Sequence, residues 1–156
     1  MSGTYATVEE VTAYLTARGL NAAWDAAGGT KQNAALVEAT SFLDAAFSWV
    51  GSIADSSQTL AWPRLCAYDR EGRVLDGIPQ QVKDACSELA NLALGGRLMP
   101  MDLASNSATV KRDKIGDVEV EYDTTNQQSC YDYVRMILRG IGGLRTNSGM
   151  NRLLRV

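Results

Sequence analysis

Apolar residues at helical spacing predict four helices along this chain. The first begins at a capping box formed by Thr7 and Glu10, and Gly19 predicts its end. The second is predicted from Lys31 to Trp49 with Thr30 as its N-cap, and it is apolar on more than one side, so we expect it to be central. The third and fourth are predicted from two buried stripes, one of Val82, Ala85, Cys86, Leu89, Leu92 and Ala93, the other of Val134, Ile137, Leu138 and Ile141.

Two segments lack this spacing. Residues 50–78 are rich in Gly, Ser, Asp, Arg and Pro and predict a structured loop, longer than the roughly 12–15 residues beyond which loops are usually functional or disordered. Val118, Val120 and Tyr122 alternate with acidic residues, and basic residues precede them, which predicts a β-hairpin. The fold class is therefore mainly α: four helices, a long structured loop after the second, and a β-hairpin between the third and fourth.

The length of 156 residues fits one domain, and its net charge of −3 is unevenly distributed. Residues 131–156 hold five arginines and one acidic residue, a net charge of +4. We expect a helical domain over 1–143 and a flexible, basic C-terminal arm over 144–156. No apolar run approaches the roughly 20 residues of a membrane-spanning helix, and no signal peptide is evident, so a cytosolic product is expected.

The residues that usually carry catalysis are few. Histidine is absent, and the three cysteines, Cys66, Cys86 and Cys130, are predicted to be free thiols. The nearest enzyme candidates are Cys86 and a group of carboxylates, and both are interpreted as structural because Cys86 lies on an apolar stripe and the carboxylates alternate along a hairpin. We expect no enzymatic activity, cofactor or metal. The carboxylates are Asp113, Asp117, Glu119, Glu121 and Asp123.

The most specific pattern is the segment Gln58-Thr59-Leu60-Ala61-Trp62-Pro63-Arg64, followed by Asp69-Arg70-Glu71-Gly72, Gly77-Ile78-Pro79 and an alanine-rich helix. Taken alone, it predicts a buried Trp62 and a turn fixed by Pro63. Arg64 is either solvated, or presented to a neighbouring subunit or to a carboxylate of its own fold. In this order the residues resemble the head-to-tail adaptor proteins of tailed bacteriophages, some relatives of which are labelled primosomal-type single-stranded DNA-binding proteins.

This resemblance implies a structural virion protein of the phage neck, assembled in the host cytoplasm. Copies would form a ring, matching the dodecameric portal, that docks on the portal protein after DNA packaging, encloses double-stranded DNA without reading its sequence, and mounts the stopper or tail-completion protein. Trp62, Pro63, Arg64, Asp69 and Arg70 would shape the loop or contact a neighbouring subunit. Position and charge suggest a portal contact made of Arg135, Arg139, Arg145, Arg152, Leu153, Leu154 and Arg155.

Two alternatives stay open. A solvated helix face and a ragged tail would also explain the basic C-terminal end. Single-stranded DNA binding would require stacking aromatics beside a basic groove, and only Tyr131 and Tyr133 lie next to Arg135 in the sequence.

Overall fold

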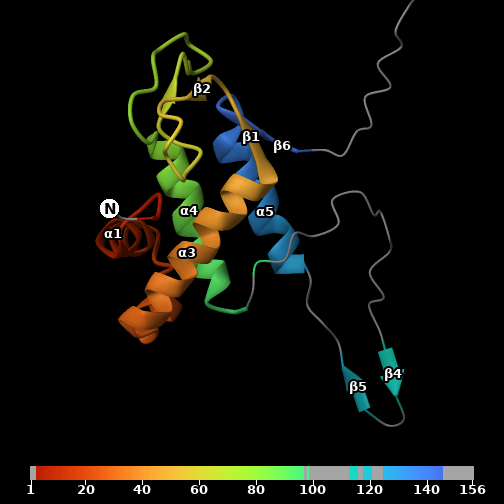
Figure 1. Ribbon diagram of the computed structural model, residues 1–156. Coiled ribbons are helices and arrows are strands. Elements are labelled where there is room, and N and C mark those ends of the chain that lie inside the picture. Colours follow the sequence, from red (N-terminus) through yellow and green to blue (C-terminus); the bar gives the residue numbers. More distant parts are fainter. Residues whose placement is uncertain (1–2, 97, 99–112, 116–117, 121–124, 146–156) are drawn as a thin grey trace, which may run out of the picture.

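The computed structural model describes residues 3–96, 98, 113–115, 118–120 and 125–145 (Figure 1). This part of the chain is mainly α, with five helices, short antiparallel strand pairs and a long loop, so the predicted fold class is confirmed. The helices are α1 (Val8–Arg18), α2 (Ala22–Ala26), α3 (Gly29–Ala46), α4 (Gln80–Ala93) and α5 (Thr125–Leu138). The short helix α2 was not predicted.

Helix α1 begins and ends as its sequence predicts. The Thr7 hydroxyl accepts a hydrogen bond from the Glu10 amide at 3.3 Å, and the Glu10 carboxylate accepts one from the Thr7 amide at 2.9 Å. Gly19 has a φ of 68° and closes the helix. Buried Trp24 in α2 donates a hydrogen bond to the Thr12 hydroxyl at 2.9 Å, which fixes α2 against α1.

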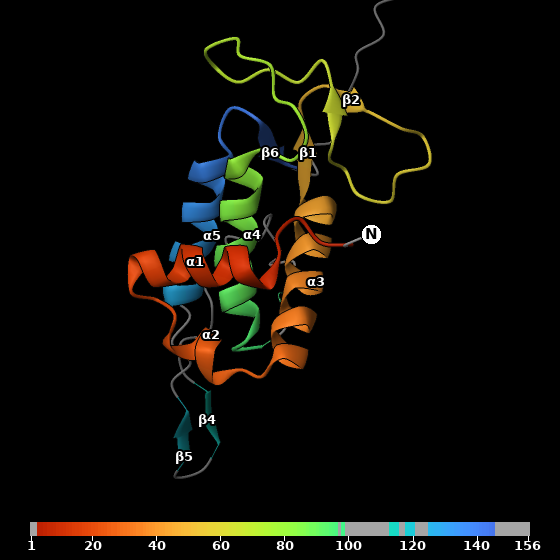
Figure 2. The same ribbon diagram turned by 90° about the vertical axis from the view of Figure 1, so that its left-hand side faces the viewer.

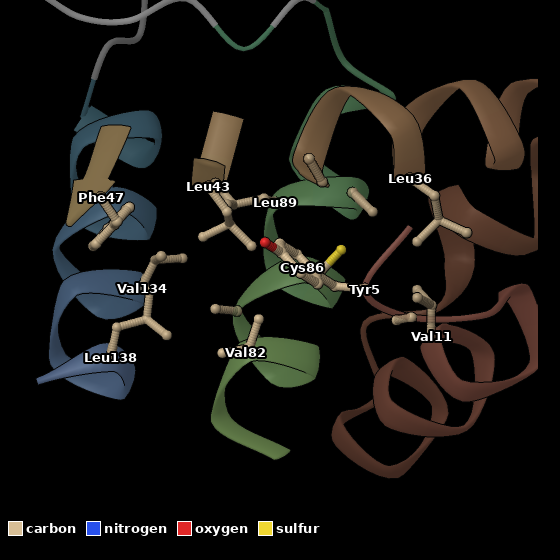
Figure 3. Packing of buried hydrophobic residues seen from close by; sticks show 14 of the residues in the cluster. Tyr5, Val11, Leu36, Leu43, Phe47, Val82, Cys86, Leu89, Val134 and Leu138 are labelled. Atoms are coloured by element: carbon tan, nitrogen blue, oxygen red, sulfur yellow. The ribbon is translucent and has the colours of Figure 1, made fainter. Parts of the chain in front are cut away.

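Helix α4 is the centre of the bundle. It packs against α1, α3 and α5, and Figure 2 shows α1 running across it. Val82, Cys86 and Leu89 are fully buried, as the apolar stripe predicts, and they meet Leu43 of α3 and Val134 of α5 in the core (Figure 3). The core therefore joins segments that are far apart in the sequence.

Helix α3 differs from its prediction at both ends. It is capped by Gly28 instead of Thr30, and it ends at Ala46. The next three residues form strand β1 (Phe47–Trp49), which pairs antiparallel with β6 (Gly142–Leu144). The prediction of helix up to Trp49 was wrong because this distant strand supplies hydrogen bonds that the local pattern cannot reveal.

Strand β6 continues past residue 143, where the end of the helical domain was expected. Leu144 lies within β6, and the Arg145 amide donates a hydrogen bond to the Ala46 carbonyl at 2.8 Å. Gly142 allows the strand to approach closely, because an added Cβ would lie 2.7 Å from the Trp49 ring. The chain is thus held to the domain as far as Arg145, and residues 146–156 lie outside the described residues.

The predicted hairpin is present as β4 (Asp113–Ile115) and β5 (Val118–Val120), with Lys114 opposite Glu119. Helix α5 begins at Thr125, whereas a polar break was expected over 124–129, and it ends at Leu138, before Ile141. The predicted apolar face is otherwise confirmed, because Val134 and Leu138 are fully buried and Ile137 is partly buried.

Residues 50–78 form the structured loop, here named the Trp-Pro-Arg loop. It contains the strand pair β2 (Ser52–Ile53) and β3 (Arg64–Leu65) and an isolated bridge between Tyr68 and Val74. Gly51 has a φ of 73°, and an added Cβ would lie 2.3 Å from the Leu65 carbonyl oxygen. Only glycine fits this crossing of the two chain segments.

A partly buried carboxylate ties this loop to the helices. Asp44 of α3 accepts hydrogen bonds from the Tyr5 hydroxyl and from the Ala61 amide, the latter at 3.3 Å. Burial raises the pKa of Asp44 above its ordinary value, against the opposing effect of these hydrogen bonds. The N-terminal segment, α3 and the loop therefore meet at one side chain.

Candidate functional site

Trp62 fills the interior beneath the Trp-Pro-Arg loop. It is 1% exposed, and its ring meets the Trp49 ring edge-on, with centroids 5.9 Å apart. Trp49 in turn stacks on Phe47 at 5.6 Å. The prediction of a buried Trp62 is confirmed, and this aromatic row joins the loop to β1.

Arg64 is committed to its own loop. Its Nε donates to the Val50 carbonyl at 2.7 Å, one terminal nitrogen to the Ala61 carbonyl at 3.1 Å, and the other to the Gly51 carbonyl at 2.8 Å. All three acceptors are backbone carbonyls. The guanidinium is therefore neither paired with a carboxylate of its own fold nor simply solvated, which were two of the expectations for Arg64. Arg64 therefore holds the loop in shape.

Gln58 supports the same loop, a role the sequence did not predict. Its side-chain amide donates to the carbonyls of Leu60 at 2.6 Å and Pro63 at 3.0 Å, and its side-chain oxygen accepts from the Asp55 amide at 3.0 Å. The first and last residues of the segment Gln58 to Arg64 thus bind the backbone between and around them.

Asp69 and Arg70 shape the outer turn. The Asp69 carboxylate accepts hydrogen bonds from the amides of Arg73 and Glu71 and from the Arg73 guanidinium, and these bonds hold its pKa below the ordinary value. Arg70 lies against Gly140, where an added Cβ would be 2.9 Å from its Cγ. Arg70 therefore links the loop to the end of α5.

The Trp-Pro-Arg loop carries four exposed apolar side chains. Ile53, Leu65, Tyr68 and Val74 are each between 50% and 69% exposed. Tyr68 and Val74 lie directly opposite one another in the isolated bridge. Neighbouring exposed apolar side chains, as Tyr68 and Val74 are, are typical of a protein-contact surface.

A cleft of about 470 Å³ lies between α5 and the β1–β6 pair. We name it the arginine cleft, because Arg135 and Arg139 lie on its wall one helical turn apart. Asp132 forms a 3.3 Å ion pair with Arg135, both side chains being about half exposed, and Met136 between the arginines is 66% exposed. The complete lining is Phe47, Asp132, Arg135, Met136, Arg139, Gly142, Gly143 and Leu144.

The structure thus brings together part of the predicted contact set. Arg135 and Arg139 share the cleft, and Arg145 directly follows its last lining residue. Arg152, Leu153, Leu154 and Arg155 lie outside the described residues. The β1–β6 pair forms one wall of the cleft, and no sequence signal in residues 142–144 predicted strand β6.

The thiol considered for catalysis is enclosed. Cys86 is fully buried, burial raises its pKa to about 11, and its sulfur lies 3.7 Å from the Thr40 hydroxyl. Cys66 is exposed and free. Among the described residues no three metal-binding side chains come together, and no helix is both long and apolar enough to cross a membrane.

A family model with the description "Putative DnaT-like ssDNA binding protein" matches residues 2–156. The chain belongs to this family. Comparison with curated proteins and with solved structures gives no match. This description agrees with the label that some relatives of the adaptor proteins carry. It names binding of single-stranded DNA, whereas the resemblance to the adaptor proteins implied a role in virion assembly.

Proposed function

We propose that this protein binds single-stranded DNA through the arginine cleft. The observation that carries the proposal is the pair of exposed guanidiniums, Arg135 and Arg139, beside the exposed apolar side chain of Met136 in one cleft. Guanidiniums form charge-assisted hydrogen bonds with phosphates, and apolar side chains pack against the faces of unpaired bases. Membership of the family supports the same ligand.

The acidic net charge does not oppose this site, because surface charges act locally at physiological ionic strength. Charges separated by more than about 8 Å of electrolyte are largely screened. The C-terminal residues 131–156 carry +4 while the chain as a whole carries −3. That +4 already includes Asp132, which forms an ion pair with Arg135, so we expect moderate affinity with a clear dependence on salt.

The test is fluorescence anisotropy with a labelled 20-nucleotide oligothymidine, titrated with wild-type protein at several salt concentrations. The double variant Arg135→Gln/Arg139→Gln removes two positive charges from the cleft. We expect at least a tenfold loss of affinity and a salt slope shallower by about 1.4, since each phosphate contact on a single strand contributes about 0.7.

The matched control is Lys31→Gln/Arg73→Gln, which removes two exposed positive charges elsewhere. It changes the net charge equally and should retain most of the affinity. Equal losses in the two double variants, or no binding by the wild-type protein at low salt, would refute the arginine cleft as a DNA site.

A second candidate is assembly in the phage neck, which the exposed apolar side chains of the Trp-Pro-Arg loop favour. We propose under this alternative that copies form a ring, dodecameric like the portal, that docks on the portal protein and receives a stopper or tail-completion protein in the virion. Tyr68 and Val74 would contact a neighbouring subunit, and residues 146–156 would reach the portal. The ring would surround double-stranded DNA.

Portal association can be measured by electron microscopy and light scattering of mixtures with the portal protein from the same genome. Deleting residues 146–156 retains β6 and the Arg145 hydrogen bond, so it removes the arm without opening the domain. We expect the deletion to abolish docking and Tyr68→Ser/Val74→Ser to prevent ring formation. Unchanged association of both variants would exclude this alternative.

A further inference from the structure

A second cationic and aromatic cluster lies where α1 meets α5. The Arg18 guanidinium is centred 3.6 Å from the centroid of the Tyr14 ring, an arrangement of the cation–π type. The Tyr14 hydroxyl donates to the carboxylate of Glu88 in α4 at 2.9 Å. Tyr133 of α5 lies close enough to the same guanidinium to interact with it electrostatically.

The cluster is rigid on its inner side and open on its outer side. Glu88 is 9% exposed and anchors Tyr14 to the central helix, whereas Tyr133 is 40% exposed and Arg18 lies on the surface. Burial and the hydrogen bond to Glu88 raise the pKa of Tyr14, so its hydroxyl stays protonated as the donor. Side chains from three helices thus place an exposed tyrosine and a surface guanidinium near one another, with Tyr14 anchored beneath the guanidinium.

Helical geometry connects this cluster to the arginine cleft. Tyr133 and Met136 are three residues apart on α5, so they are neighbours on the exposed side of the helix, and Arg139 directly follows the helix end at Leu138. The rise from Tyr133 to Met136 is about 4.5 Å, from three residues at about 1.5 Å each. Met136 and Arg139 also line the cleft.

We propose that Tyr133 stacks on one nucleobase of a bound single strand and that Arg18 contacts the adjoining phosphate. This proposal rests on the DNA-binding function proposed above and extends its site across α5 toward α1. A tyrosine ring accepts the face of any base, and a guanidinium stacked on a second ring keeps its edge free for phosphate oxygens. Asp84 opposes this contact, because its negative charge acts on Arg18 electrostatically.

The test uses the same labelled oligothymidine and a second strand with abasic sites throughout its interior. Tyr133→Ala should weaken binding to oligothymidine roughly 5- to 150-fold, the range for losing one stacked base. Tyr133→Phe keeps the ring and should bind within about twofold of wild type. Tyr68→Ala, which removes another exposed tyrosine, on the Trp-Pro-Arg loop, is the matched control and should change little.

The two proposed contacts can be distinguished by abasic-strand affinity and by the salt dependence of binding. On the abasic strand, wild type and Tyr133→Ala should bind equally, because no base is present to stack. Arg18→Gln should make the salt slope shallower by about 0.7, whereas Tyr133→Ala should leave the slope unchanged. Asp84→Asn should tighten binding by removing the opposing charge.

The outcomes also separate this proposal from the one on which it rests. If wild type binds and Arg135→Gln/Arg139→Gln loses affinity while Tyr133→Ala does not, the stacking contact is refuted and the arginine cleft stands. If Tyr133→Ala weakens binding to the abasic strand as much as to oligothymidine, stacking is refuted. If wild type binds neither strand, both proposals fall. Circular dichroism and thermal melting verify that each variant is folded.

Discussion

Replacing Arg64 by alanine tests whether the most specific segment of the sequence is a structural brace. The guanidinium donates to the carbonyls of Val50, Gly51 and Ala61, at 2.7, 2.8 and 3.1 Å. All three lie on parts of the Trp-Pro-Arg loop that cross one another. Without Arg64, the three carbonyls lose their common hydrogen-bond donor and must accept hydrogen bonds from water instead.

The expected magnitude follows from these three bonds. A hydrogen bond involving a charged group contributes about 1.5–3 kcal/mol, but Arg64 is half-buried and water can replace part of what it supplies, so we expect a net loss of about 2–4 kcal/mol. For a chain of this size that corresponds to a fall in Tm of roughly 4–16 °C. Arg64→Lys should lose most of this stabilisation, because an ammonium group cannot reproduce the planar fork.

The assay is urea unfolding at 25 °C followed by tryptophan fluorescence, with Arg73→Ala as the control. Arg73 lies on the same loop, is largely exposed and pairs with Asp69, so its replacement should leave the unfolding midpoint almost unchanged. An Arg64→Ala midpoint equal to that of Arg73→Ala, or an Arg64→Lys variant as stable as wild type, would show that the three hydrogen bonds do not brace the loop.

Three further predictions concern the folded domain. Gly51→Ala should lower Tm far more than Gly72→Ala in differential scanning calorimetry, because both glycines have positive φ but only the first has a carbonyl oxygen 2.3 Å from the added Cβ. Iodoacetamide at pH 7.5 should modify Cys66 and spare Cys86 in peptide mapping of the native protein, since burial raises the pKa of Cys86 to about 11; rapid Cys86 labelling would contradict its burial. The pKa of Asp44 is raised in the folded state, so the folded state binds the Asp44 proton more tightly than the unfolded state does. The stabilisation that this proton supplies is complete below the unfolded pKa, and it is lost as the pH rises through the folded pKa. The stability of wild type relative to Asp44→Asn should therefore fall from pH 4 upward in urea titrations, and a rise would reverse the assigned direction.

The elements that could be predicted are those stabilised by their own neighbours. The Thr7 and Glu10 capping box, the glycine stop at Gly19 and the buried stripe of α4 all involve residues at most four positions apart, so the chain shows them directly. Strands β1 and β6 have three residues each and pair across more than ninety positions. A strand of three residues shows almost no periodicity, and its partner is invisible until the chain is folded.

The candidate site, too, could be predicted only in part from the sequence. Sequence reasoning selected Arg135, Arg139 and Arg145 from the charge of the C-terminal end, and the structure places the first two in one cleft. It did not select Arg18 or Tyr14, because no local pattern connects α1 with Tyr133. Contacts between helices depend on packing angles that the spacing of residues along one helix does not contain.

The sequence by itself determined the mainly helical class, the order of the longer helices, the buried Trp62 and the basic character of the C-terminal end. These follow from periodicity, capping, side-chain size and composition, which are properties of the chain before it folds. Only the tertiary structure decided that Arg64 binds three carbonyls of its own loop, that β6 forms a wall of the cleft with Arg135 and Arg139, and that Tyr133 lies near Arg18. Each of these depends on which distant segments the common core brings within hydrogen-bonding distance.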